Sequence, residues 1–204
     1  MKKKKTIILL APKRCGTTAI FNVFKKHSKV KVAHHDQQIE NWEPQFWNLS
    51  LDAINGNSRE LISRMKKTFP KVKFYKPFNK KKIFLLWNSI LEEYGPCIFD
   101  KSPQYIYNYK TLNLIYEFKK KGNDVRFISL LRNPRDAITS QHELWKEYTG
   151  EYNLKKREKN WLKYISNIEK FRSKVKFPLF RYEDIATVSY THLTLPTSVL
   201  VDMW

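Results

Sequence analysis

Short runs of apolar residues alternate along the chain with longer stretches in which apolar residues recur every three or four positions. Most of the short runs are rich in β-branched residues and predict strands, at 6–11, 30–33, 97–100, 125–131 and 177–182. The longer stretches predict helices, at 17–27, 58–69, 80–94, 104–121, 134–148 and 154–174. Segment 34–48 has no clean period and is predicted to be a loop. Strands that alternate with helices indicate an α/β domain with a mostly parallel central sheet flanked by helices.

Three polar turns directly follow predicted strands. They are the stretches PKRCGTT at 12–18, KSP at 101–103 and RNPRD at 132–136. In the last of them, Asn133 is a favoured N-cap residue and Pro134 suits the first position of a helix. Ligands of parallel α/β sheets bind at the carboxyl ends of the strands. We therefore expect the three turns to meet along one edge of the sheet.

The chain has 204 residues, of which 42% are hydrophobic, and this suits one domain with a full core. Its formal charge of +20 would attract anions such as nucleotides, acidic glycans, nucleic acid or acidic lipid, although a solvated lysine surface is the alternative. Cys15 and Cys97 are the two cysteines, which suits a reducing compartment and predicts a cytoplasmic protein. No segment approaches the ~18 apolar residues of a membrane span. The start, MKKKKTIILLA, is interpreted as a basic leader into the first strand.

The turn PKRCGTT has the features of an anion-binding loop. A strand, a glycine turn and a helix together place backbone N–H groups at the positive end of a helix dipole, where phosphate or sulfate binds. Gly16 allows close approach, Thr17 and Thr18 add hydroxyl donors, and Lys13 and Arg14 add positive charge. The alternative is an ordinary strand-to-helix turn.

Known phosphate loops of three other kinds fit this turn poorly. The ATP and GTP loop requires a glycine where Ala11 stands and a lysine where Thr17 stands. A dinucleotide loop requires three closely spaced glycines, and only Gly16 is present. A cysteine phosphatase requires an arginine at the position of Phe21.

Four segments, in order, resemble the sulfotransferases that use 3'-phosphoadenosine 5'-phosphosulfate (PAPS). PKRCGTT resembles their 5'-phosphosulfate loop, and LLRNPRDAITSQHELW at 130–145 resembles their 3'-phosphate motif. FDKSPQYI at 99–106 is similar to a turn of the carbohydrate-modifying branch, and FRYEDI at 180–185 is similar to a late motif of the domain. The resemblance covers about 6–185 and implies a fold related to the P-loop NTPases.

The resemblance implies the residues that hold the donor. They are Lys13, Arg14, Cys15, Gly16, Thr17, Thr18, Ala19, Arg132 and Ser140. Arg132 stands where a strand ends and Ser140 lies nearly two helical turns later, so both could reach one phosphate. The alternatives are a surface serine and a salt bridge from Arg132 to Asp136, and we expect Asp136 to be structural. The family needs no metal, and no clustered His or Cys spacing suggests one.

The implied reaction is the in-line transfer of a sulfuryl group to an acceptor hydroxyl or amine, on a small molecule or a glycan. Charge develops on the bridging oxygen of the leaving phosphate, where cations would stabilise it. Arg14 is the first candidate for this role, Lys13 could share it, and Lys101 is a second candidate from the KSP turn. Lys101 could instead be a surface lysine. We expect no specific nucleic acid partner.

A general base must take the proton of the acceptor. Counting from Arg14, the resemblance to the heparan-sulfate type implies Asp36 for this role, with His35 as the second candidate beside His34. A polar loop without chemistry is the alternative. Three aromatic residues follow and could stack on a sugar or a phenol, or pack in the core: Trp42, Phe46 and Trp47.

The helix N-terminus beside Cys15 predicts a lowered thiol pKa, unless only the backbone N–H of this residue matters. The segment from Val188 to Trp204 resembles translated sequencing adapter, so we expect a native domain over 1–187 that is incomplete at its C-terminus. A kinase of related fold and a non-enzymatic polyanion-binding protein are the alternative functions. The sequence does not name the acceptor.

Overall fold

The computed structural model describes residues 4–33, 43–95, 97–149 and 153–191. Its centre is one parallel sheet whose five strands lie in the order β2-β3-β1-β4-β5. The strands are β1 (Lys5–Leu10), β2 (Lys31–Val32), β3 (Cys97–Lys101), β4 (Asp124–Leu131) and β5 (Leu179–Arg181). The predicted α/β class with a parallel central sheet is confirmed.

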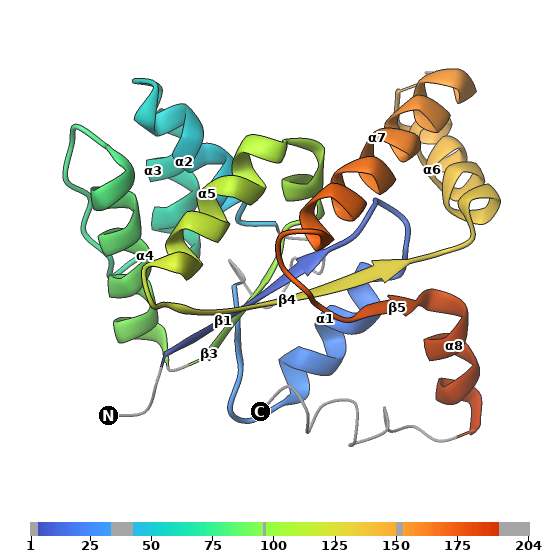
Figure 1. Cartoon of the computed structure of the whole chain (residues 1–204), viewed down its shortest axis with the longest axis horizontal. Helices are drawn as coiled ribbons and strands as arrows, with labels where there is room; N and C mark the ends of the chain where they lie inside the picture. Colours follow the sequence, from blue (N-terminus) through green and yellow to red (C-terminus); the bar gives the residue numbers. More distant parts are fainter. Residues whose placement is uncertain (1–3, 34–42, 96, 150–152, 192–204) are drawn as a thin grey trace.

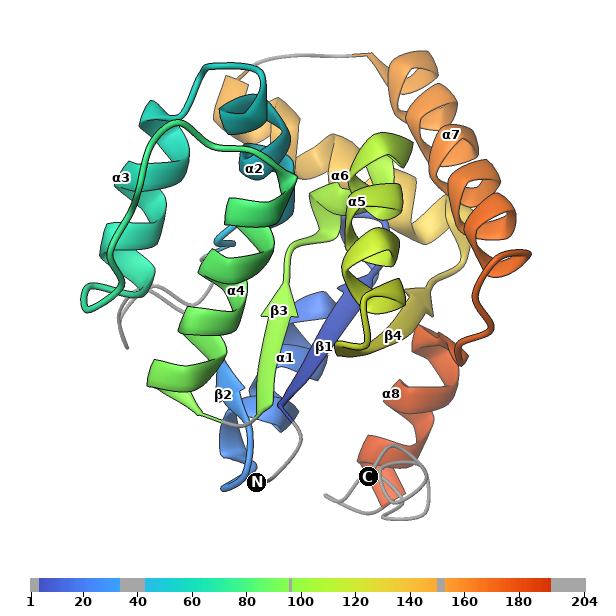
Figure 2. The same ribbon diagram turned by 60° about the vertical axis from the view of Figure 1, so that its left-hand side comes forward.

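The register of the sheet brings the predicted functional turns together. Leu9 of β1 is paired with Lys101 at the end of β3 and with Ile128 near the end of β4. The arrowheads of β1, β3 and β4 consequently point to the same edge (Figure 2). The turns that follow these three strands meet at that edge, as the sequence predicts.

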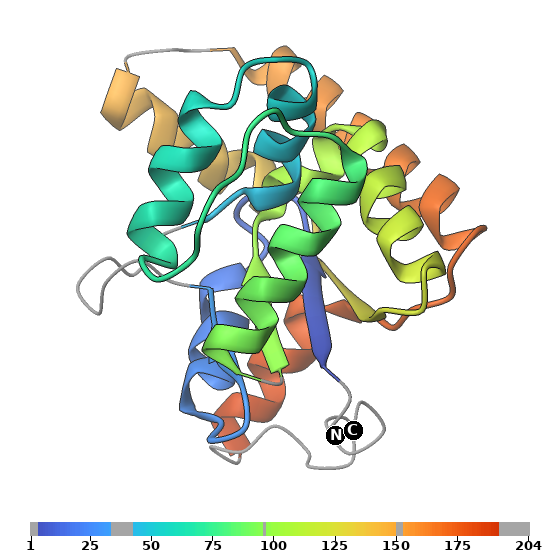
Figure 3. The same ribbon diagram turned by 90° about the vertical axis from the view of Figure 1, so that its left-hand side faces the viewer.

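Helices cover both faces of the sheet. They are α1 (Thr17–Lys26), α2 (Phe46–Ile54), α3 (Arg59–Thr68), α4 (Lys80–Tyr94), the 3-10 helix η1 (Pro103–Tyr107), α5 (Tyr109–Lys120), α6 (Pro134–Thr149), α7 (Leu154–Arg172) and α8 (Tyr182–Thr191). Helices α4 and α5 lie on one face, and α1 and α8 lie on the other (Figures 1 and 2). Figure 3 shows α3, α4 and α5 side by side over the first of these faces. None of the described helices is long and apolar enough to cross a membrane.

Strand β1 is buried on both faces because its apolar run is continuous. Ile8 and Leu10 pack into the core cluster under α4 and α5, while Ile7 and Leu9 pack into the cluster that includes α1. The Trp87 indole of α4 donates a buried hydrogen bond of 2.8 Å to the Thr6 hydroxyl and so fixes this helix to the strand.

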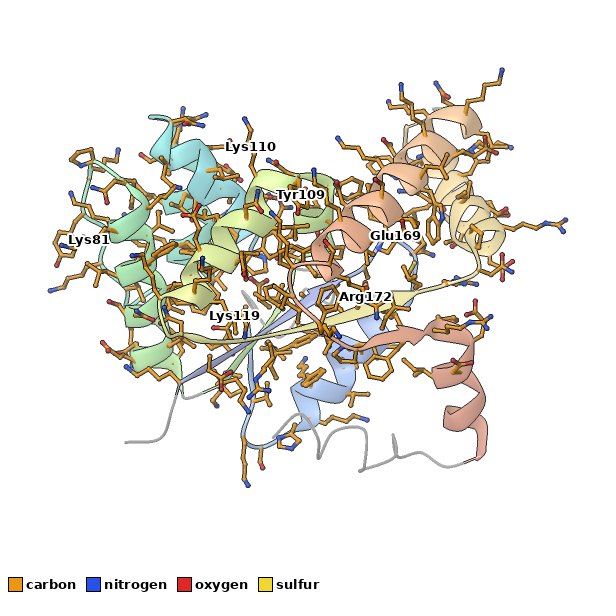
Figure 4. The ribbon with its side chains drawn as sticks, in the orientation of Figure 1. Lys81, Tyr109, Lys110, Lys119, Glu169 and Arg172 are labelled. Carbon is orange, nitrogen blue, oxygen red and sulfur yellow. The ribbon has the colours of Figure 1, made fainter. Side chains whose placement is uncertain are left out.

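Helix α5 runs along the same face as α4. Figure 4 shows Tyr109 at its start and Lys119 near its other end. The Asn108 side chain caps the first turn by accepting from the Lys110 amide, and the Lys119 ammonium donates to the Val125 carbonyl at 2.7 Å. The predicted single helix over 104–121 is wrong, because η1 occupies 103–107 and Asn108 separates it from α5.

Two further predicted elements differ from the structure. Helix α2 begins at Phe46, inside the segment that was predicted to be a loop. Strand β5 is shorter than predicted, because α8 begins at Tyr182.

Of the two roles left open for the aromatic residues at 42–47, stacking on an acceptor or packing in the core, the structure shows core packing for the two that it describes. Phe46 and Trp47 are fully buried, and both rings lie against Trp87 of α4. An acceptor therefore has no access to either ring. Trp42 lies outside the described residues.

Candidate active site

The loop between β1 and α1 turns sharply. Arg14 and Gly16 both have left-handed backbone conformations, with φ of 66° and 83°. Gly16 is the N-cap of α1, where it supplies no side chain, and the first turn of the helix contains no acidic residue. The amide end of the α1 dipole therefore faces the loop without a competing side-chain anion, which is how helix N-termini bind phosphate and sulfate.

The Tyr182 ring lies directly over Gly16. A Cβ atom placed on Gly16 would lie 2.3 Å from Cδ2 of this ring, so the position has room only for glycine. The guanidinium of Arg132 lies 4.9 Å from the centroid of the same ring, and its Nη1 donates to the Arg14 carbonyl at 3.3 Å. Tyr182 thus packs against both the anion-binding loop and the arginine that follows β4.

Arg14 and Ser140 meet across the same edge of the sheet. The Nε atom of Arg14 donates to the Ser140 hydroxyl at 3.0 Å, although 126 residues separate them in the chain. Together with the contact from Arg132 to the Arg14 carbonyl, this bond joins the loop after β1 to the loop and helix after β4. The structure thus brings together three residues that the sequence predicts for donor binding.

Glu183 gives the late FRYEDI motif a structural role. Its Oε1 atom accepts from the Asn133 amide at 2.7 Å, one residue after Arg132. This hydrogen bond is the main reason that the pKa of Glu183 is lowered, and Arg181 and Arg132 lower it further. The motif therefore fixes the turn that carries Arg132.

A pocket of about 410 Å³ lies between these segments. It is lined by Lys13, Arg14, Gly16, Thr17, Thr18, Glu43, Lys101, Pro103, Arg132, Leu144 and Tyr182. Five residues of the predicted anion-binding loop line this pocket, and so do the two other predicted cations, Lys101 and Arg132. Its volume suits a small polar ligand.

Lys101 is a buried cation beside the pocket, and only 2% of it is exposed. Burial lowers the pKa of its ammonium, and the charge of Glu43 opposes this effect. Its Nζ atom also lies 5.6 Å from the centroid of the Phe21 ring. The alternative of a surface lysine is therefore wrong, because Lys101 lies inside the site.

Glu43 is a pocket residue that the sequence reasoning missed. Burial raises the pKa of its carboxyl, while the positive charges of Lys101, Lys13 and Arg64 oppose this. Glu43 lies in the segment that has no hydrophobic period. The one feature of the sequence that could have indicated it is that a carboxylate stands there, a few residues after the predicted base Asp36.

Asp100 is a completely buried carboxylate at the end of β3. The Ser102 hydroxyl donates to one of its oxygens at 2.8 Å, and the Tyr105 hydroxyl donates to the other at 2.7 Å. Burial raises the pKa of Asp100 to about 6, although these two hydrogen bonds oppose the effect. The sequence reasoning assigned no role to Asp100 or Tyr105.

Tyr107 is another missed residue of this edge. Its phenol is hydrogen-bonded by the Lys13 backbone amide and by the Gln141 side chain, and burial raises its pKa. Its ring lies against Tyr164 of α7, with the two centroids 3.7 Å apart. Tyr107 therefore connects η1 to the anion-binding loop and to α6.

A family model described as the sulfotransferase family matches residues 6–196. The chain belongs to the sulfotransferase family. No protein with curated annotation matches it.

Two solved sulfotransferases share the fold. The sulfotransferase domain from the curacin biosynthetic pathway is 20% identical, with a TM-score of 0.57 over 94% of this chain and 71% of that one. The sulfotransferase from Alicyclobacillus acidocaldarius is 14% identical, with a TM-score of 0.54 over 92% of this chain and 76% of that one.

One site prediction for this sulfotransferase is wrong. The Cys15 thiol was expected to have a lowered pKa, but burial raises the pKa to about 12. The thiol is fully buried, and a backbone hydrogen bond from Arg132 and the charge of this residue only partly offset the desolvation. Only the alternative, a backbone role for Cys15, remains.

The other predicted residues are placed as follows. Lys13 extends toward Trp145 of α6, with its Nζ atom 5.7 Å from the ring centroid, and Ala19 is exposed in the first turn of α1. Asp136 is exposed in the first turn of α6, where its charge complements the helix dipole. The predicted base Asp36 and its neighbours His35 and His34 lie outside the described residues. Among the described residues, no group of His, Cys, Asp or Glu could hold a metal ion.

Proposed function

We propose that this chain transfers a sulfuryl group from PAPS to a hydroxyl or amine of a small molecule or glycan. The observation that carries the proposal is the convergence of Arg14, Arg132 and Ser140 beside a glycine loop. A pocket with the buried cation Lys101 on its wall adjoins them. This arrangement supplies anion donors from several strand ends at once, which suits a ligand with more than one phosphate-like group.

The two ends of the donor would contact different parts of the site. The amides of the loop and of the first turn of α1, from Cys15 to Ala19, would hold the 5'-phosphosulfate together with the Thr17 and Thr18 hydroxyls. Arg132 and Ser140 would hold the 3'-phosphate. Arg14 lies in the loop and contacts Ser140, so it stands between the two ends.

The residues near the reacting atoms are cations and a carboxylate. The acceptor oxygen or nitrogen forms a bond to sulfur, the bond from sulfur to the bridging phosphate oxygen breaks, and adenosine 3',5'-bisphosphate leaves. Lys13, Arg14 and Lys101 would stabilise the charge on that oxygen. This chemistry needs no metal.

Two carboxylates are candidates for the base that takes the acceptor proton. Asp36, with His35 second, remains the prediction from the family resemblance. Glu43 is the second carboxylate candidate, because it lines the pocket. Burial raises its pKa, which makes it a stronger base, and it lies near Lys101. The variants Asp36→Asn and Glu43→Gln separate the two, because only the loss of the true base should reduce turnover while donor binding is kept.

Donor binding is the first property to measure. We expect adenosine 3',5'-bisphosphate in EDTA to raise the melting temperature, by a stabilisation of about 2.7 kcal/mol at 100 times Kd. Arg132→Ala should abolish the effect, whereas the control Arg135→Ala should keep it, because Arg135 is exposed outside the pocket. A response only to ATP with magnesium would favour a kinase. A response to any polyanion that disappears steeply with salt would favour a polyanion-binding protein.

The reduced state expected for Cys15 and Cys97 supports our proposal that the protein acts in the cytoplasm. Both thiols are free and buried. An activity that survives in strong thiol reductant would agree with this proposal.

A further inference from the structure

A chain of hydrogen bonds connects Asp100 to the segment that carries Glu43. The Gln45 amide donates to the Ser102 hydroxyl oxygen at 3.1 Å, and the Trp47 amide donates to the Tyr105 hydroxyl oxygen at 3.4 Å. Each hydroxyl in turn donates its own proton to one oxygen of Asp100. Two backbone amides are thus held by one buried carboxylate through two hydroxyl groups.

The direction of these bonds requires a side chain at residue 100 with two oxygens that both accept hydrogen bonds. A hydroxyl has one proton, and when it gives that proton to Asp100 its lone pairs are left to accept from the amides. An asparagine at this position would have one oxygen and one NH₂ group. The NH₂ group would donate to a hydroxyl, compete with the backbone amide for its lone pairs and leave the hydroxyl proton without its acceptor.

The held segment has a demanding local conformation. Gln45 has a left-handed φ of 53° and precedes α2 as an N-cap without a side-chain hydrogen bond. Such a conformation persists for a residue other than glycine only where its surroundings enforce it. Glu43 lies two residues earlier, and its carbonyl also accepts from Arg64 Nη1 at 3.0 Å. The Ser102 and Tyr105 contacts therefore hold the backbone at Gln45 and Trp47, directly after Glu43.

We propose that Asp100 is a positioning residue, which acts through Ser102 and Tyr105 to hold Glu43 beside Lys101 in the pocket. The proposal rests on the proposed function for its consequence in catalysis, because Glu43 is there one of the two candidate carboxylates for the base that receives the acceptor proton. The placement of Glu43 itself can be tested without an acceptor. The cations whose charges act on Glu43 are Lys101, Lys13 and Arg64, and the Asp100 carboxylate also interacts with it electrostatically.

The test follows the titration of Glu43 by ¹³C NMR of its carboxyl, assigned by the loss of its signal in Glu43→Gln. In the wild type the carboxyl should titrate above its ordinary pKa, as burial requires. In Asp100→Asn the pKa of Glu43 should fall toward the ordinary value, because the segment is released toward water and the repulsion from the Asp100 charge is lost. Tyr105→Phe keeps Ser102 and the Asp100 charge, so it isolates the positioning contact and should give a smaller shift in the same direction.

Thr6→Val is the matched control. It removes a buried hydroxyl that accepts from Trp87, whose ring packs on Phe46 and Trp47. It therefore destabilises the core next to the segment, while the hydrogen bonds of Asp100, Ser102 and Tyr105 are kept. It should leave the Glu43 titration unchanged. An unchanged titration in Tyr105→Phe would overturn the proposal, because a shift in Asp100→Asn alone would come from the lost charge. An equal shift in Thr6→Val would also overturn it.

A second reading separates this inference from the proposed function. Adenosine 3',5'-bisphosphate should stabilise Asp100→Asn as much as it stabilises the wild type, because Asp100 is not among the residues at the donor loop. Loss of this stabilisation in the wild type would reject the donor assignment, while the Glu43 titration would still decide the positioning role. Loss in the variant alone would overturn the positioning role, since Asp100 would then act on the donor half of the site.

Discussion

Replacement of Gly16 by alanine should destabilise the protein more than the same replacement at Gly122. Both glycines have left-handed backbones, with φ of 83° and 88°, so alanine carries a similar conformational cost at each. That cost is about 1–2 kcal/mol. The two sites differ in their surroundings: nothing lies within 4 Å of a Cβ at Gly122, whereas a Cβ at Gly16 would lie 2.3 Å from the Tyr182 ring.

The additional cost at Gly16 comes from moving this ring. Ordinary carbon contacts begin near 3.4 Å, so Tyr182 must retreat by about 1 Å and loosen its contact with Arg132. Overpacking of this kind costs about 1–3 kcal/mol. We therefore expect a total of about 2–5 kcal/mol for Gly16→Ala, against about 1–2 kcal/mol for Gly122→Ala.

Urea unfolding of the two variants measures these values, and a double-mutant cycle with Tyr182→Ala isolates the clash. Without the ring, Gly16→Ala should cost no more than Gly122→Ala. The reasoning would be refuted if Gly16→Ala cost the same with and without Tyr182, or if the two glycine variants were equally stable. Gly16→Ala should also weaken the stabilisation by adenosine 3',5'-bisphosphate, whereas Gly122→Ala should not.

Three further predictions concern ionisable groups. Because the pKa of Glu183 is lowered, its hydrogen bond to Asn133 stabilises the fold above the ordinary carboxyl pKa, and this stabilisation is lost as the pH falls through the lowered value. The variant Glu183→Gln should therefore show a smaller loss of stability at acid pH, measured by urea unfolding. The thiol pKa values of Cys15 and Cys97 are raised by burial to about 12 and about 11, so Ellman's reagent should label both only as fast as the protein unfolds, and rapid labelling in the native state would contradict this. Burial raises the pKa of Asp100 from 3.8 to about 6, so its contribution to the free energy of unfolding is largest below pH 3.8 and falls by roughly 3 kcal/mol as the pH rises to about 6. Asp100→Asn should remove this dependence of stability on pH.

Much of the fold could be predicted because local pattern and tertiary burial agree. The run 6–11 is apolar at consecutive positions, and β1 is in fact covered on both faces. Asn133 and Pro134 predicted the start of α6 correctly. The start of α2 was missed because Phe46 and Trp47 are adjacent and both fully buried, which removes the helical period from the sequence.

The predicted helix over 104–121 failed for a tertiary reason. Tyr105 is held in η1 by its hydrogen bond to Asp100 and by the amide of Trp47, and neither contact can be read from the local sequence. Asn108 then caps a new helix. The local pattern showed apolar residues at helical spacing on both sides of this break, and so it suggested continuity.

The candidate site shows the same division. Arg14, Arg132 and Ser140 were predicted because they belong to sequence motifs that resemble those of a known family. The structure brings these three residues into contact. Glu43 and Tyr107 belong to no such motif. Glu43 lines the pocket and Tyr107 contacts Lys13 because segments distant in the sequence fold side by side, which only the three-dimensional arrangement reveals.

The ionisable groups around the pocket argue for chemistry because they are costly to the fold. Asp100 and Lys101 are almost completely buried, and desolvation shifts the pKa of each toward its neutral form. A fold selected for stability alone would gain by replacing such groups with apolar side chains of similar volume. Here each is instead compensated, Asp100 by two hydroxyl groups and Lys101 by the charge of Glu43. They also stand at the carboxyl end of β3, the edge at which parallel sheets bind their ligands. The desolvation cost therefore falls at the position where these groups could interact with a charged substrate.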